Sequence, residues 1–125
     1  MESARISEAL RALVFDPDPD AGLGETIDRY YAPDYTHRSD GRTLDRAAFV
    51  AMVAGIRSLV AAGTVTVLDE VRDGSVYAER HVFRLTLKDG SEQHREVAVF
   101  GVLAEDGRFL HLSETGFEVP PEEAA

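Results

Sequence analysis

The sequence predicts a single α+β domain in which N-terminal helices cover one face of an antiparallel sheet. Apolar residues recur at helical spacing as far as about residue 62 and then alternate with a period of two. Asp-Gly pairs separate the alternating segments, and Asp-Gly is favoured where antiparallel strands reverse. Helices followed by a run of strands are typical of an α+β fold.

Two short helices are predicted before residue 32. Residues 3–15 carry apolar side chains at helical spacing, with Ser3 or Ser7 available as an N-terminal cap. Prolines within residues 16–20 end this helix, because proline disfavours helix at its own position and at the residue before it. Residues 22–31 then resume a helical pattern.

A long amphipathic helix is predicted to begin at its cap, Thr43, and to run to about Ala62, where Gly63 ends it. The apolar stripe expected to be buried consists of Leu44, Phe49, Val53, Ile56 and Val60.

Four strands are predicted from the alternating segments, at residues 64–71, 76–88, 93–104 and 108–119. The domain is therefore expected to span residues 1–119. The remaining residues, 120–125, consist of proline, glutamate and alanine and are expected to form a disordered tail.

Composition excludes several classes of function. The formal net charge of −10 repels nucleic-acid phosphates and anionic lipid, so neither nucleic acid nor a membrane is expected as a partner. The absence of cysteine excludes disulfides and thiol catalysis and fits a cytoplasmic location. No apolar run approaches the ~20 residues that cross a bilayer, and residues 1–5 lack the pattern of a secretion signal.

The segment of residues 30–42 is the expected wall of a small-molecule pocket. It is predicted to leave one helix, run briefly extended and enter the next, with turns at Pro33 and Gly41. Tyr31 and Tyr35 would each supply an aromatic wall and a hydroxyl, although core packing explains them almost as well. Binding groups tend to lie on connections of this kind.

Two polar residues of this segment are candidate site residues. His37 can donate or accept a proton at neutral pH, or it can fix the segment by a backbone hydrogen bond. Asp40 is expected to serve as a turn or capping residue rather than as a base, close to the pocket wall.

Glu114 is the leading catalytic candidate. Strand alternation places Leu110, Leu112 and Glu114 on one face and Phe109 on the other. Because its face is otherwise apolar, the Glu114 carboxyl is expected to point inward with a raised pKa, which suits proton transfer. The alternative is an exposed glutamate at the end of a strand.

Glu79 and His81 share the more apolar face of their strand with Tyr77 and Phe83. Buried charges need partners, and these two residues are close enough to pair. They form either a structural pair or, with His81 facing the ligand, part of the pocket. Arg80 and its neighbours on the opposite face are expected on the solvent or dimer side.

Other site types are not supported. No two histidines have metal-ligand spacing, and the sequence lacks the glycine-rich phosphate-binding motifs and the Gly-x-Ser-x-Gly of serine hydrolases. We therefore expect neither a metal nor a cofactor.

The order and content of these segments resemble the nuclear-transport-factor-two-like superfamily, in particular its SnoaL-like branch. The segments that carry the resemblance are residues 31–37, 40–43, 78–84, 99–100, 106–109 and 112–114. The resemblance implies a cone-shaped fold in which a strongly curved, mainly antiparallel sheet encloses a pocket, and a homodimer formed through the outer face of the sheet.

The resemblance also bears on chemistry. In SnoaL-like cyclases an acid/base residue lies five positions after the apolar residue that follows a Gly-Arg turn, and Phe109 and Glu114 reproduce that spacing with Glu in place of Asp. Steroid isomerases of the superfamily carry an acidic hydrogen-bond donor where this chain has Val99, which disfavours that reaction. The superfamily includes many proteins that only bind a ligand, so the fold does not decide the function.

Two hypotheses follow for the function. In the first, the protein is a cofactor-free isomerase, cyclase or lyase acting on a small apolar molecule. Glu114 would move the proton, His37 or His81 would polarise a carbonyl, and Phe49, Val53 and Ile56 would line the cavity with the tyrosines. In the second, the protein is a non-catalytic ligand-binding or structural dimer of the same fold.

Overall fold

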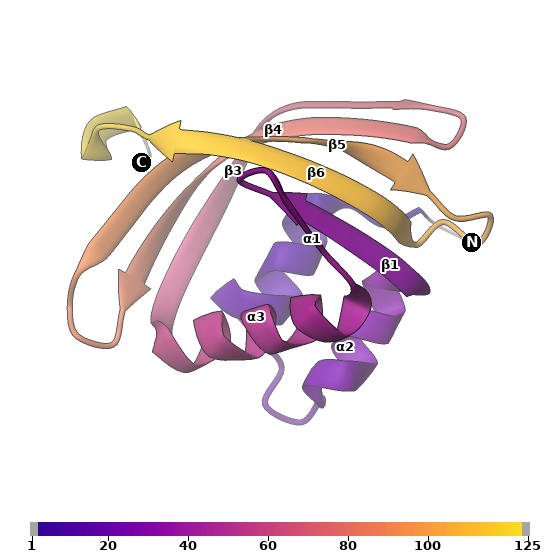
Figure 1. Ribbon diagram of the computed structural model, residues 1–125. Helices are drawn as coiled ribbons and strands as arrows, with labels where there is room; N and C mark the ends of the chain where they lie inside the picture. Colours follow the sequence, from indigo (N-terminus) through magenta and orange to yellow (C-terminus); the bar gives the residue numbers. More distant parts are fainter. Residues whose placement is uncertain (1–2, 124–125) are drawn as a thin grey trace.

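Helices on the concave side of a curled sheet make up the fold (Figure 1). The computed structural model describes residues 3–123. The helical elements are α1 (Ile6–Leu10), the π-helical turn η1 (Arg11–Phe15), α2 (Leu23–Tyr30), α3 (Arg46–Leu59) and the 3₁₀ turn η2 (Pro121–Glu123). The strands are β1 (Tyr31–Ser39), β2 (Arg42–Leu44), β3 (Val60–Asp73), β4 (Val76–Leu87), β5 (Glu92–Leu103) and β6 (Phe109–Glu118).

The six strands form one mixed sheet in the order β2-β1-β6-β5-β4-β3. All neighbouring strands are antiparallel except β1 and β6, which run parallel. The sheet arches over α3 and the N-terminal helices, and β2 and β3 remain at its two edges, so it is curled but not closed (Figure 1). The predicted α+β class and strongly curved, mainly antiparallel sheet are confirmed.

The predicted bounds of the long helix are wrong at both ends. Asp45 is the N-cap in place of Thr43, and its Oδ1 accepts a hydrogen bond of 2.9 Å from the Ala48 amide. The helix ends at Leu59, because Val60 adopts an extended conformation and begins the pairing of β3 with β4. Gly63 therefore lies within a strand and does not end the helix.

The largest difference from the prediction lies between residues 31 and 44. The expected short connection is the nine-residue strand β1, followed by β2. Pro33 is tolerated in β1 because the register with β6 shifts between Tyr31 and Thr36, where proline does not interrupt a ladder hydrogen bond. Asp40 and Gly41 form the turn between β1 and β2, both with positive φ, as a two-residue hairpin turn requires.

The first predicted helix is shorter and less regular than expected. It begins after Arg5, which makes no side-chain capping bond, so the prediction of a serine cap is wrong. Ser7 is buried inside the helix, and from Arg11 the helix continues as a π-helical turn to Phe15.

At the other end of the chain, the predicted disorder of 120–125 stays a prediction. Residues 121–123 form a 3₁₀ turn, and residues 124 and 125 lie outside the described part of the chain. Among the helices of residues 3–123, none is long and apolar enough to cross a membrane.

An aromatic cluster joins the helices to the sheet. Tyr31 of β1 packs against Tyr35, Phe49 of α3 and Phe109 of β6, with ring centroids 4.6, 4.9 and 5.4 Å away. Tyr77 of β4 also packs against Phe109, with ring centroids 5.4 Å apart. These contacts hold α3, β1 and β6 at fixed positions, and the candidate site lies where those elements meet.

Candidate functional site

A cavity of about 330 Å³ lies between the helices and the inner face of the sheet. Its volume is within the usual range of ligand sites, which begins near ~300 Å³. Of the sequence-predicted site residues, the cavity is lined by Tyr31, His37, Asp40, Phe49, Val53, Ile56, His81 and Glu114. Tyr35 and Glu79 are buried next to the cavity but are not among the residues that line it.

Strand β6 brings Glu114 to the cavity in spite of an irregularity that the sequence did not reveal. The register between β5 and β6 shifts at Val102–Leu103, so alternation along β6 is broken. Phe109 is therefore buried against Tyr31 in the core, and the prediction that it lies on the opposite face from Glu114 is wrong. Glu114 itself lines the cavity, with about a third of its side chain exposed.

Three side chains form a chain of contacts at the cavity wall. His37 Nε2 lies 3.4 Å from Glu114 Oε1, and His37 Nδ1 lies 2.6 Å from the Tyr35 hydroxyl. His37 is buried, and within the described residues its Nε2 has no partner with hydrogen-bond geometry. A polar nitrogen beside a carboxylate is thus left available to a ligand.

The tautomer of His37 follows from these contacts. A neutral imidazole carries one N–H, and a bare Nε2 lone pair beside the Glu114 carboxylate would be repulsive. The favourable assignment is that the Tyr35 hydroxyl donates to Nδ1 and that Nε2 carries the hydrogen. Burial raises the pKa of the Tyr35 hydroxyl, so it remains a neutral donor. His37 therefore presents an N–H donor next to a carboxylate acceptor.

The expected raised pKa of Glu114 is wrong. Burial does raise the pKa of this carboxyl, but the His37 imidazole 3.4 Å away, with smaller effects from Ser39 and His81, lowers it further than burial raises it. The net pKa lies below that of an ordinary glutamate. At neutral pH Glu114 is therefore an ionised carboxylate, which can accept a proton.

Glu79 and His81 of β4 make a second pair. His81 Nδ1 lies 2.7 Å from Glu79 Oε1, and both side chains are almost fully buried. Burial raises the pKa of Glu79 in spite of the hydrogen bond and charge of His81. His81 lines the cavity, with Nε2 as its remaining ring nitrogen.

Arg95 of β5 is a cavity residue that the sequence analysis missed. It lies two positions before Val97 and four before Val99, both buried on the inner face, so strand alternation alone would have found it. Its guanidinium passes over Gly116 of β6, where an added Cβ would lie 3.4 Å from Nη2.

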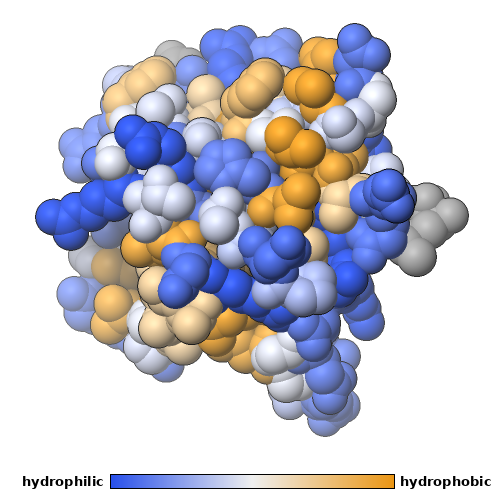
Figure 2. Space-filling view, turned by 45° about the vertical axis from the view of Figure 1, so that its right-hand side comes forward, coloured by the Kyte–Doolittle hydropathy of each residue, from blue (hydrophilic) through white to orange (hydrophobic). Residues whose placement is uncertain are grey.

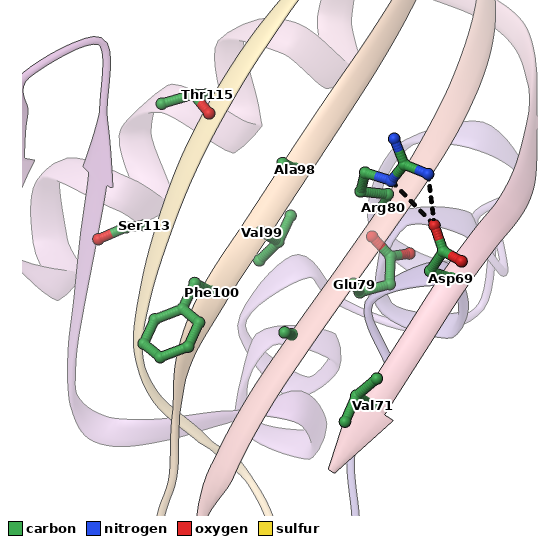
Figure 3. Close-up of a pocket in the computed structure, with 10 residues that line it drawn as sticks. Asp69, Val71, Glu79, Arg80, Ala98, Val99, Phe100, Ser113 and Thr115 are labelled. Atoms are coloured by element: carbon green, nitrogen blue, oxygen red, sulfur yellow. Dashed lines mark hydrogen bonds and ion pairs between the residues drawn. The ribbon is translucent and has the colours of Figure 1, made fainter.

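The outer face of the sheet carries a separate hollow of about 410 Å³ (Figure 3). Its apolar lining includes Val71, Ala78, Ala98 and the exposed ring of Phe100. Arg80 lies on this face, as predicted, and binds Asp69 through two hydrogen bonds of 2.6 and 2.9 Å. In the view of Figure 2, hydrophobic residues likewise gather in patches between hydrophilic ones.

Within residues 3–123 no three or more histidine, aspartate or glutamate side chains gather in an arrangement that would hold a metal ion. The sequence-based expectation that the protein uses no metal and no cofactor stays a prediction.

Comparison with known proteins identifies the fold. No family model and no curated protein matches the chain. A loop-truncation variant of IdmH, a candidate polyketide cyclase from Streptomyces antibioticus, superposes with a TM-score of 0.68 at 21% identity, over 89% of this chain and 88% of that one. A candidate polyketide cyclase from Acidithiobacillus ferrooxidans gives a TM-score of 0.67 at 18% identity, over 89% and 84% of the two chains.

A third solved structure has a small molecule bound. This protein from Catenulispora acidiphila, with a ketosteroid-isomerase-like fold, is in complex with trimethylamine and superposes with a TM-score of 0.68 at 14% identity, over 94% of this chain and 88% of that one. Identities this low establish a shared fold and leave the reaction open.

Proposed function

The chain adopts the nuclear-transport-factor-two-like fold in its SnoaL-like form, and from this premise we propose that it is a cofactor-free enzyme acting on a small, largely apolar carbonyl compound. The observation that carries the proposal is the contact between Glu114 and His37 at the wall of the cavity. An ionised acceptor and an N–H donor there meet the two requirements for removing a proton next to a carbonyl.

The proposed reaction begins with proton transfer from carbon to Glu114. The electron pair of the broken C–H bond moves into the carbonyl, and the oxygen becomes an enolate. The His37 Nε2–H donates a hydrogen bond to this oxygen, while Tyr35 holds the imidazole in the required tautomer. Where the enolate is conjugated with a C=C bond, return of the proton from Glu114 to the far carbon gives an isomer. Alternatively, the enolate carbon attacks a second carbonyl and closes a ring, and Glu114 returns the proton to the new alkoxide oxygen.

The remaining candidate residues have supporting roles in this proposal. Tyr31, Phe49, Val53 and Ile56 form the apolar wall for the substrate. His81, oriented by Glu79, offers a second polar contact through Nε2. Asp40 lies at the β1–β2 turn beside the cavity and shapes its edge.

Hydrogen–deuterium exchange tests the proposal without knowledge of the natural substrate. Apolar ketones with an acidic C–H, such as 2-tetralone, are incubated with the protein in D₂O, and exchange is followed by NMR. Glu114→Gln should slow the protein-dependent exchange about 100-fold or more. Glu118→Gln, which removes an exposed carboxylate of the same strand, should leave it unchanged. Equal rates in wild type and Glu114→Gln would refute the role of Glu114.

A second candidate function is ligand binding without chemistry. The lowered pKa of Glu114 favours it, because a carboxylate with a low pKa is a weak base. In the exchange experiment this function predicts that ketones bind to the protein while their C–H exchange stays at the background rate.

We also propose that two copies associate through the outer face of the sheet. Phe100 and Val71, both about 60% exposed, give this face an apolar centre that a second copy would cover. Phe100→Glu should shift the protein toward monomer in analytical ultracentrifugation, whereas Leu59→Glu, at an equally exposed residue of α3, should not. The cytoplasmic location stays a prediction.

A further inference from the structure

Arg95 differs from the other arginines of the chain in its surroundings. Among residues 3–123, most arginines bind a carboxylate, a hydroxyl or a backbone carbonyl. Arg29, Arg42 and Arg95 make no such contact. Arg29 and Arg42 are exposed and hydrated, whereas Arg95 is half-buried at the cavity. A guanidinium that has lost part of its hydration and has no counter-ion is expected to bind an anion.

Arg95 lines the cavity and also a smaller hollow of about 250 Å³ that it shares with Glu118. Phe83 of β4 lies opposite Arg95 in register and also lines the cavity. On the other side, Gly116 has no side chain, so the guanidinium can lie across β6 instead of extending into solvent. A Cβ at residue 116 would also lie 2.8 Å from the Glu96 carbonyl oxygen, so this close approach of β5 and β6 favours glycine.

The carboxylate with the best access to Arg95 within the chain is Glu118, which lies opposite it in register on β6. Glu118 is exposed, and no ion pair within 4.0 Å joins it to Arg95. The other acids at the cavity, Asp40 and Glu114, likewise make no ion pair with Arg95 in the structure. The described residues therefore leave the guanidinium available to a ligand.

We propose that Arg95 binds a carboxylate group of the ligand, and that the substrate is an apolar carboxylic acid rather than a neutral hydrocarbon-like ketone. This inference rests on the proposed function, since it concerns the same cavity. The planar guanidinium fork matches the two oxygens of a carboxylate, and in a partly dry site such a pair is strong.

The same geometry fixes how the substrate would lie. Glu114 is two residues from Gly116 on the same face of β6, which is about 7 Å at the rise of a strand. With its carboxylate over Gly116, the ligand would present to Glu114 a carbon several bonds away along its skeleton. The acid group and the acidic C–H are therefore expected at separate ends of one small molecule.

The net charge of −10 makes this local contact necessary. An overall negative protein repels an anion at long range, and this repulsion is screened beyond about 10 Å in ordinary salt. Affinity for an acid must then come from a cation within the site, and Arg95 is the arginine among the cavity residues.

Isothermal titration calorimetry with matched probes tests the inference. The probes are phenylalkanoates of increasing chain length and the corresponding primary amides, which have nearly the same shape without the charge. The best acid should bind wild type about tenfold or more tightly than its amide. Arg95→Gln should weaken binding of the acid to the level of the amide and leave the affinity of the amide unchanged.

Three further variants make the result specific. Arg84→Gln makes the same charge change on the outer face, where Arg84 binds Glu92, and should leave both affinities unchanged. Glu118→Gln should preserve the preference for the acid. Arg95→Lys should retain a reduced preference, since an ammonium keeps the charge but lacks the fork; it also covers the case in which Arg95→Gln does not fold.

The possible outcomes separate this inference from the proposed function. Equal binding of acid and amide to wild type, or an equal loss of both in Arg95→Gln, would overturn the carboxylate site and leave the cavity as a ligand site. Failure of every acid and every amide to bind would overturn the ligand-binding cavity itself. Ketone exchange by wild type together with equal acid and amide binding would uphold the proposed chemistry and refute the role of Arg95.

Discussion

Two glutamate–histidine pairs face the interior of the sheet, and they differ in every physical respect that bears on function. Glu114 and His37 come from neighbouring parallel strands, lie 3.4 Å apart, and leave the carboxylate about a third exposed. Glu79 and His81 come from the same strand, lie 2.7 Å apart, and are almost fully buried. The first pair has a lowered carboxyl pKa and the second a raised one.

This difference indicates that the two pairs have different roles, one structural and one in ligand contact. In the tight, dry pair, Glu79 Oε1 and His81 Nδ1 are hydrogen-bonded to each other, which fixes the orientation of His81. A looser pair at the cavity wall leaves His37 Nε2 and a hydrated carboxylate free to meet a ligand. The sequence predicted all four side chains as candidate site residues, and only their separation in space distinguishes a structural pair from a reactive one.

The largest expected effect is the loss of stability when the histidine of the buried pair is replaced. His81→Leu removes the hydrogen-bond donor of Glu79 and leaves a carboxyl in a dry interior, so the free energy of unfolding should fall by about 3 kcal/mol. Urea denaturation measures it. The double variant Glu79→Met with His81→Leu should recover part of the loss, because it removes both polar side chains of the pair and leaves neither one buried without its partner.

The corresponding change in the other pair needs a matched background. His37→Leu alone would leave the buried Tyr35 hydroxyl without a hydrogen-bond partner. The stability of the double variant Tyr35→Phe with His37→Leu is therefore compared with that of Tyr35→Phe. Because water hydrates Glu114, the further loss should be only about 1 kcal/mol or less. Equal losses at His37 and His81 would contradict the distinction between the pairs.

A smaller effect tests whether the β1–β2 hairpin holds the reactive pair. Gly41 has a φ of 79° with open space around it, so Gly41→Ala costs only backbone strain, about 1 kcal/mol. His37 lies on the strand that leads into this turn, and its imidazole NMR signals should shift while those of His81 do not. Gly74→Ala, with a φ of 60° in the β3–β4 turn, has the same kind of strain and should leave the His37 signals in place.

The sequence predicted the fold well because the change from helical to alternating periodicity and the Asp-Gly turns are local signals. It failed where the outcome depends on distant partners. Strand β1 was not predicted at its full length because Pro33 is unfavourable within a strand. The strand forms because it pairs in parallel with β6, with a register shift around the proline. The pKa of Glu114 depends on His37 from another strand. A prediction based only on the apolar neighbours along β6 therefore gave the wrong direction for the pKa shift.

Arg95 was missed by the sequence analysis for a different reason. Its alternation with Val97 on β5 was visible in the sequence, and its lack of a counter-ion was not, because that requires the positions of all the surrounding acids. Individual residues on inner faces could thus be predicted, whereas which of them are satisfied within the protein could not.

The smallest expected effect is a difference in the pH dependence of stability. The folded-state pKa of Glu114 is lowered, so its contribution to stability is present above the unfolded pKa, near 4.5, and is lost as pH falls through the folded pKa. The stability difference between wild type and Glu114→Gln should therefore grow as pH rises from acid to neutral. Urea denaturation at a series of pH values measures this difference.

Glu79 should give the opposite slope. Its folded-state pKa is raised, so its favourable contribution is present below the unfolded pKa and is lost as pH rises through the folded pKa. Against Glu79→Gln, the stability of wild type should decline from acid toward neutral pH. Slopes of the same sign for both variants would mean that the two carboxyls share one environment, and the assignment of Glu114 as the ionised, ligand-facing member would fail. Opposite slopes would establish that this curved sheet keeps one glutamate charged at the cavity and the other protonated more readily behind it.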